Sequence, residues 1–105
     1  MPVVALFITA SSPAEGKKIS DALLKERLVA CVNALPGVTS RYWWKGRIAS
    51  AKEVLLVAKT LRSKLPAVVR RVKALHSYEV PEVLALPAAG GNAEYLAWVA
   101  SSVKK

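Results

Sequence analysis

The segment that most constrains the fold is Glu53 to Leu61, EVLLVAKTL, because both of its sides are apolar. Successive side chains of an extended strand point to opposite faces of a sheet. One face would carry Val54, Leu56 and Ala58, and the other Leu55, Val57 and Leu61. A layer of helices can cover only one of these faces, and a large exposed apolar patch usually marks contact with a partner. The pattern therefore predicts a homo-oligomer.

Hydrophobic periodicity and turn residues divide the chain into a βαββαβ order with an added C-terminal helix. Strands are expected at residues 3–9, 29–35 continuing through 38–44, 53–61 and 82–86. Helices are expected from Pro13 to near Arg27, over residues 65–75, and after Asn92. This order indicates an α+β, ferredoxin-like sandwich whose helices cover one face of an antiparallel sheet. The 105 residues suit a single domain over 1–105.

Short polar and flexible residues punctuate these elements. Ser12, Ser63 and Asn92 precede the three helical patterns and are expected to be their N-caps. Pro36-Gly37 predicts a turn or bulge within the second strand. Lys45-Gly46-Arg47 predicts a tight turn, so that the second and third strands form a long hairpin.

Composition limits the class of partner and the compartment. The chain has 16 Lys and Arg against 7 Asp and Glu, a net charge of +9 that attracts anions. These residues are scattered, and no basic tail or RNP-type motif is present, so nucleic acid is not the expected partner. No apolar run approaches the roughly 20 residues of a membrane span. A single cysteine, Cys31, cannot form an internal disulfide, and a reducing cytoplasm is expected.

Three stretches resemble one protein family. They are RLVACVNALPGVTSRYWWKG at residues 27–46, EVLLVAKT at 53–60, and HSYEVPEVLALP with GGNAEYLAWV at 76–87 and 90–99. In their order and spacing they resemble the CutA divalent-cation-tolerance family, over nearly the whole chain. The resemblance implies a homotrimer whose long hairpin reaches a neighbour, a role in tolerance of divalent metals such as copper, and no established enzymatic reaction.

Metal ligands are few in this chain. Copper favours thiolate and imidazole ligands, and Cys31 and His76 are the only cysteine and histidine. The resemblance implies a first-strand cysteine and a histidine pair as copper ligands, but Ile8 and Leu75 occupy two of those three positions. We therefore expect weak binding of copper or another divalent cation, with His76 as the candidate metal ligand. The alternative role for His76 is structural, at the C-terminal end of the second helix.

Lys59 is a cation within an otherwise apolar strand, where an unpaired charge is costly to bury. One interpretation is an ion pair, which could form across subunits. The other, which the resemblance suggests, is an anion-binding cleft between subunits. The candidate cleft residues are Glu53, Lys59, His76, Tyr78 and Glu82.

The densest aromatic cluster is Tyr42, Trp43 and Trp44 on the predicted hairpin. Alternation places Tyr42 and Trp44 on one face and Trp43 on the other. Aromatic residues on a hairpin favour sheet and interface packing, although they could also stack a base. We expect them to be interface residues.

The expected function is that of a non-enzymatic, CutA-like trimer in divalent cation tolerance, since no catalytic set is visible and Asp21 is the only aspartate. One alternative is a trimeric signalling module that binds a nucleotide or small anion, resembling the nitrogen-regulatory proteins. Their long loop between the second and third strands has no counterpart in the short turn at Lys45-Gly46-Arg47. A third possibility is a structural trimer that anchors a partner.

Overall fold

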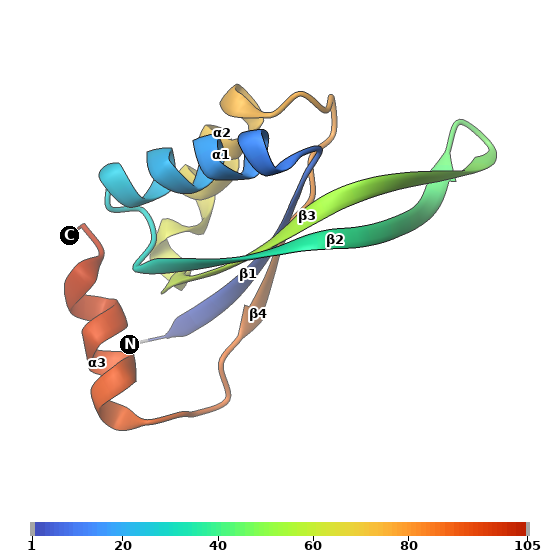
Figure 1. The fold of residues 1–105 in the computed structure, drawn as a ribbon. Coiled ribbons are helices and arrows are strands. Elements are labelled where there is room, and N and C mark those ends of the chain that lie inside the picture. The colour runs from blue at the N-terminus through green and yellow to red at the C-terminus, as the bar shows by residue number, and fades with distance from the viewer. Residues whose placement is uncertain (1, 105) are drawn as a thin grey trace.

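The computed structural model describes residues 2–104, in which four antiparallel strands carry three helices (Figure 1). The elements in chain order are β1 (Val3–Ala10), α1 (Pro13–Lys25), β2 (Cys31–Trp44), β3 (Arg47–Leu61), the short 3₁₀ helix η1 (Arg62–Lys64), α2 (Leu65–Leu75), β4 (Val83–Pro87) and α3 (Ala93–Ser102). The strand order in the sheet is β2-β3-β1-β4. The predicted α+β architecture and βαββαβ order with an added helix are confirmed.

The hairpin of β2 and β3 is the longest feature and projects as an arm beyond the rest of the sheet (Figure 1). A bulge between Leu35 and Val38 accommodates Pro36-Gly37, and Gly37 takes a positive φ of 75° that favours glycine. Strand β3 is longer than predicted, because its first residues, 47–52, lack an apolar pattern and are held extended by pairing with β2.

The predicted tight turn closes the arm. Trp44 pairs with Arg47, which leaves Lys45 and Gly46 as the two loop residues. Their φ angles are 51° and 75°, and a two-residue turn with both loop residues at positive φ matches the twist of the flanking strands.

One face of the sheet is covered by α1 and α2 (Figure 1). The strand residues on this face include Leu6, Ile8, Leu56 and Ala58, none of which is exposed. They pack against Ile19 and Leu23 of α1 and Val68 and Val72 of α2, which are equally buried. This set is the core of the domain.

The opposite face, here called the open face, is apolar but only partly covered. The register places Phe7 opposite both Val57 and Leu84 on this face. Leu84 is 56% exposed. Helix α3 lies near one end of this face, where Tyr95 contacts Cys31 with 3.6 Å between the hydroxyl and Sγ. The predicted two-sided apolar strand is therefore confirmed, with α3 on the side opposite α1 and α2 (Figure 1).

Two of the three predicted helix caps are confirmed. The Ser12 hydroxyl accepts from the Glu15 N–H at 3.1 Å, and Asn92 accepts from the Glu94 N–H at 2.9 Å. Helix α1 ends at Lys25, slightly before the predicted Arg27, which has a left-handed φ of 54°. The prediction of Ser63 as an N-cap is wrong.

The reason lies in the residues before α2. Ser63 sits inside η1, which runs directly into Leu65, so Lys64 becomes the N-cap and makes no side-chain capping bond. Pro66 at the first turn supplies the start signal instead, because its fixed φ suits that position.

Candidate functional site

A cavity of about 720 Å³ lies between the hairpin arm and the segment that joins α2 to β4. Its lining includes Ser40, Tyr42, Trp44 and Glu53 from the arm, and Tyr78, Glu79 and Glu82 from the connecting segment. The cavity thus combines aromatic rings with carboxylates in a chain whose net charge is +9.

The strand register explains the aromatic lining. Tyr42 pairs with Ala49 and Trp44 with Arg47, which places both rings on the open face. Trp43 pairs with Ile48 on the other face and is 73% exposed at the edge of the cavity. The predicted alternation of the three aromatics is confirmed.

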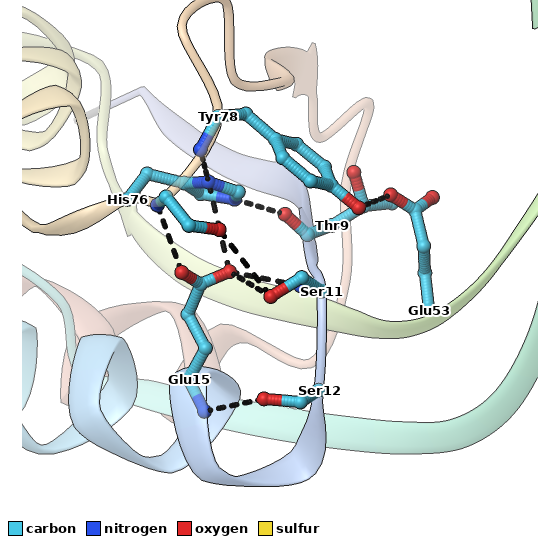
Figure 2. Close-up of polar contacts among 8 residues, drawn as sticks. Thr9, Ser11, Ser12, Glu15, Glu53, His76 and Tyr78 are labelled. Carbon is cyan, nitrogen blue, oxygen red and sulfur yellow. Dashed lines mark hydrogen bonds and ion pairs between the residues drawn. The ribbon is translucent and has the colours of Figure 1, made fainter.

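Glu53 is the most buried carboxylate of the cavity, with 6% of its surface exposed. Its Oε2 accepts a hydrogen bond of 2.7 Å from the Tyr78 hydroxyl (Figure 2). Burial, together with this bond to a negatively charged group, raises the pKa of Tyr78 to about 12. Within residues 2–104, no Lys or Arg lies within ion-pair distance of Glu53, so its partner is a neutral donor.

Glu82 lies in the same cavity, and the charge of Glu53 affects the pKa of its carboxyl group. Burial raises the pKa of the Glu82 carboxyl, and the neighbouring charge of Glu53 raises it further. Two like charges in one partly desolvated space disfavour each other. The three glutamates of the lining outnumber its one basic residue, Arg41, so the cavity favours a cation.

His76 lies next to Tyr78 of the cavity lining and is the C-cap residue of α2. Its backbone N–H donates to the Val72 carbonyl at 2.9 Å. Its imidazole is fully buried. Nδ1 accepts from the Tyr78 N–H at 3.0 Å, and Nε2 lies 2.7 Å from the Thr9 carbonyl oxygen (Figure 2). Because an N–H can only donate and a carbonyl can only accept, Nε2 carries the ring proton. A metal ion could bind this imidazole only by displacing one of the two bonds.

Glu15 joins the first helix to the same region. Its carboxylate accepts from the N–H and hydroxyl of Ser11 and from the Ser77 N–H, at 2.8–2.9 Å (Figure 2). Burial alone would raise the pKa of Glu15, but these hydrogen bonds outweigh it and lower the pKa to about 2. Glu15 Oε1 also lies 3.6 Å from His76 Nδ1. The network fixes the start of the segment that carries Tyr78.

The structure brings together only part of the predicted cleft. Glu53, Tyr78 and Glu82 line the cavity, and His76 supports Tyr78 from behind. Lys59 is on the same face of β3 but six residues further along, which is about 20 Å, and its amine donates to the Asn33 side chain.

The two soft candidate metal ligands, Cys31 and His76, also lie apart. Cys31 pairs in register with Lys59 and contacts Tyr95, whereas the His76 ring contacts Thr9. Among residues 2–104, no three His, Cys, Asp or Glu side chains converge in a group that could hold a metal ion.

Sequence reasoning missed the part played by Glu15. A glutamate three residues after an N-cap serine is the pattern of a capping box, in which the glutamate bonds back to the cap residue. In the structure it bonds to Ser11 and Ser77 instead. The partner at Ser77 is 62 residues away, and no local pattern signals it.

The fold and cavity define a class: ferredoxin-like α+β domains with one helical layer and one open, apolar sheet face. Comparison with known proteins identifies the family within that class. The model of the CutA1 divalent ion tolerance protein family matches residues 4–102, and the chain belongs to this family. That assignment does not favour the nitrogen-regulatory alternative.

Several relatives are similar over nine-tenths of the chain or more. The chain is 42% identical to Protein CutA 1, chloroplastic, from Oryza sativa over 105 residues, and 49% identical to the Divalent-cation tolerance protein CutA from Thermus thermophilus over 94 residues. It spans 59% of the rice protein's length and 91% of the Thermus protein's length.

Solved structures agree with these sequence matches. The Thermus thermophilus divalent cation tolerance protein superposes with a TM-score of 0.95 at 45% identity, covering 97% of this chain and 99% of that one. CutA1 from Oryza sativa superposes with a TM-score of 0.97 at 42% identity, covering 100% and 96%. Across residues 2–104, none of the helices has the length and apolar character needed to span a membrane.

Proposed function

We propose that the chain forms a homotrimer that takes part in tolerance of divalent metal ions and catalyses no reaction. Membership of the divalent ion tolerance family supports the role. The apolar open face supports the assembly, because Leu84 and Leu86 remain 56% and 40% exposed in a single copy. The unpaired cysteine supports a reducing cytoplasm as the compartment, which cell fractionation followed by immunoblotting would test.

The observation that carries a role in binding is the charge of the cavity. Three of the seven acidic residues, Glu53, Glu79 and Glu82, line one space that has a single basic residue, Arg41, in a chain with net charge +9. Carboxylate oxygens suit hard and borderline divalent cations. The separation of Cys31 from His76 does not favour a tight copper site within one chain. Because these carboxylates line one cavity but do not converge in a group that could hold a metal ion within residues 2–104, we propose only weak binding of divalent cations, copper among them, through the negative charge of the cavity.

Calorimetric titration of the purified protein with Mn²⁺, Zn²⁺, Cu²⁺ and ATP tests this proposal. We expect saturable binding of a divalent ion at micromolar to millimolar concentration, weakened several-fold by Glu82→Gln. Saturation with ATP but with none of the metals would contradict the proposal and favour the nucleotide-binding alternative.

A second variant tests the predicted role of His76. His76→Gln keeps one acceptor and one donor for Tyr78 and Thr9 but removes the imidazole. If His76 is a copper ligand, copper binding is lost in this variant while Glu82→Gln retains it. The opposite result assigns the binding to the carboxylates.

A further inference from the structure

Two charged groups that flank the apolar centre of the open face, the Glu53 carboxylate and the Lys59 ammonium, lack a charged partner within the described part of the chain. Glu53 is 6% exposed and bonded only to the neutral Tyr78 hydroxyl. Lys59 is partly buried, lies in register between Ala5 and Cys31, and donates to the neutral side chain of Asn33. Buried charges are costly unless they are paired.

These two groups cannot meet within one chain. They are on the same face of the same strand, six residues or about 20 Å apart. The side chains between them on this face, Leu55 and Val57, are apolar. When another copy covers the apolar face, the covering surface also removes water from both charges. Each charge then needs an opposite charge from the covering copy.

We infer that Lys59 of one copy enters the cavity of the next copy and pairs with Glu53 there. The inference rests on the homotrimer proposed above, and it gives Glu53 the charged partner that a single chain does not supply, since Arg41, the basic residue of the cavity lining, makes no ion pair with it. A contact between different patches of neighbouring copies closes into a ring when the rotation allows it. Two points about 20 Å apart superimpose after a threefold rotation if each lies about 12 Å from the axis.

The pairing also gives the carboxylates of the cavity two different roles. With Glu53 neutralised by the ammonium group, Glu79 and Glu82 remain as the carboxylates that face a free cation. Both of them lie on the segment between α2 and β4, next to Tyr78. Binding of a metal ion and contact between copies would then share one cavity but use different carboxylates.

A double-mutant cycle with Glu53→Gln and Lys59→Met tests the pairing. Residues more than about 10 Å apart usually act additively, so coupling between these two can arise only from contact between copies. We expect the effects on the unfolding equilibrium of the trimer to be non-additive by about tenfold. Lys73→Met, in the exposed last turn of α2, is the matched control and should be additive with Glu53→Gln.

The mass of the unmodified protein, measured by light scattering, distinguishes a failure of the homotrimer from a failure of the pairing. A mass near 11.3 kDa overturns the homotrimer and the pairing together. A trimeric mass with additive effects overturns the pairing alone.

Charge reversal gives a second test that does not depend on the neutral variants folding. Glu53→Lys or Lys59→Glu alone would bring like charges together and should prevent assembly. The chain carrying both substitutions should recover the trimeric mass. Failure of the double variant to assemble, with both single variants also dissociated, would overturn the pairing.

Discussion

The two faces of the sheet use the same strand in different ways. On the covered face, Leu56 and Ala58 have no exposed surface and are packed entirely by helices of their own chain. On the open face, Leu55 and Val57 remain partly exposed, and the charged residues Glu53 and Lys59 lie at either end. The covered face is complete in one copy. The open face has the composition of a surface that another copy completes, with an apolar centre and charges at its rim.

Alanine substitutions of the adjacent residues Leu55 and Leu56 test this comparison and should have the largest effects. Leu56→Ala removes a side chain from the fully buried core and should lower the free energy of unfolding by about 2–5 kcal/mol. The oligomeric mass should not change. Urea denaturation and light scattering measure the two effects.

Leu55→Ala is the matched variant on the other face. It should weaken assembly, so that on dilution its mass by light scattering falls below that of the trimer at a higher protein concentration than for the unmodified chain. If both variants gave the same stability loss, independent of concentration, the open face would not be a contact surface between copies.

A substitution of Glu15 tests how its hydrogen bonds stabilise the segment that carries Tyr78. The expected effect on the free energy of unfolding is intermediate. Its pKa of about 2 lies below its usual value of about 4.5, so the folded state binds the proton less readily than the unfolded chain. The stabilisation is therefore present above pH 4.5 and is lost as the pH falls towards 2. Glu15→Gln should cost about 2 kcal/mol at pH 6, because several hydrogen bonds to a charged acceptor are weakened.

Denaturant titrations at pH 6 and pH 3 measure this dependence. The difference between the unmodified chain and Glu15→Gln should narrow at the lower pH. Glu94→Gln, in the exposed first turn of α3, is the control and should show a much smaller change. A difference that stays constant between the two pH values would show that the charge of Glu15 does not stabilise the fold.

Local patterns were enough to predict the elements and both faces of β3. The period-two alternation of EVLLVAKTL, the Ser12 and Asn92 caps and the Lys45-Gly46 turn each depend on neighbouring residues, and all agree with the structure. The first six residues of β3 were not predicted, because residues 47–52 become a strand only by pairing with β2. Ser63 was misassigned because a 3₁₀ turn competes with a capped helix start.

The candidate site was predicted only in part, for a related reason. The motif HSYEVPE placed His76, Tyr78 and Glu82 close together in sequence, and the fold keeps them close. The contact of Tyr78 with Glu53 depends on tertiary structure, and the bond of Glu15 to Ser77 joins two distant segments. Lys59 is a predicted member of the same cleft, but within one chain it lies about 20 Å from Glu53 along β3.

The tip of the hairpin arm should show the smallest effect, because it lies beyond both faces. Gly46 has a φ of 75°, and a side chain there would meet no atom within 4 Å. The cost of Gly46→Ala is therefore backbone strain alone, about 1 kcal/mol in the free energy of unfolding. Thermal denaturation followed by circular dichroism measures it, with Gly90→Ala, an open loop position without positive φ, as the control. A loss well above this value would mean that the tip is packed against another copy, and would extend the contact surface of the open face to the end of the arm.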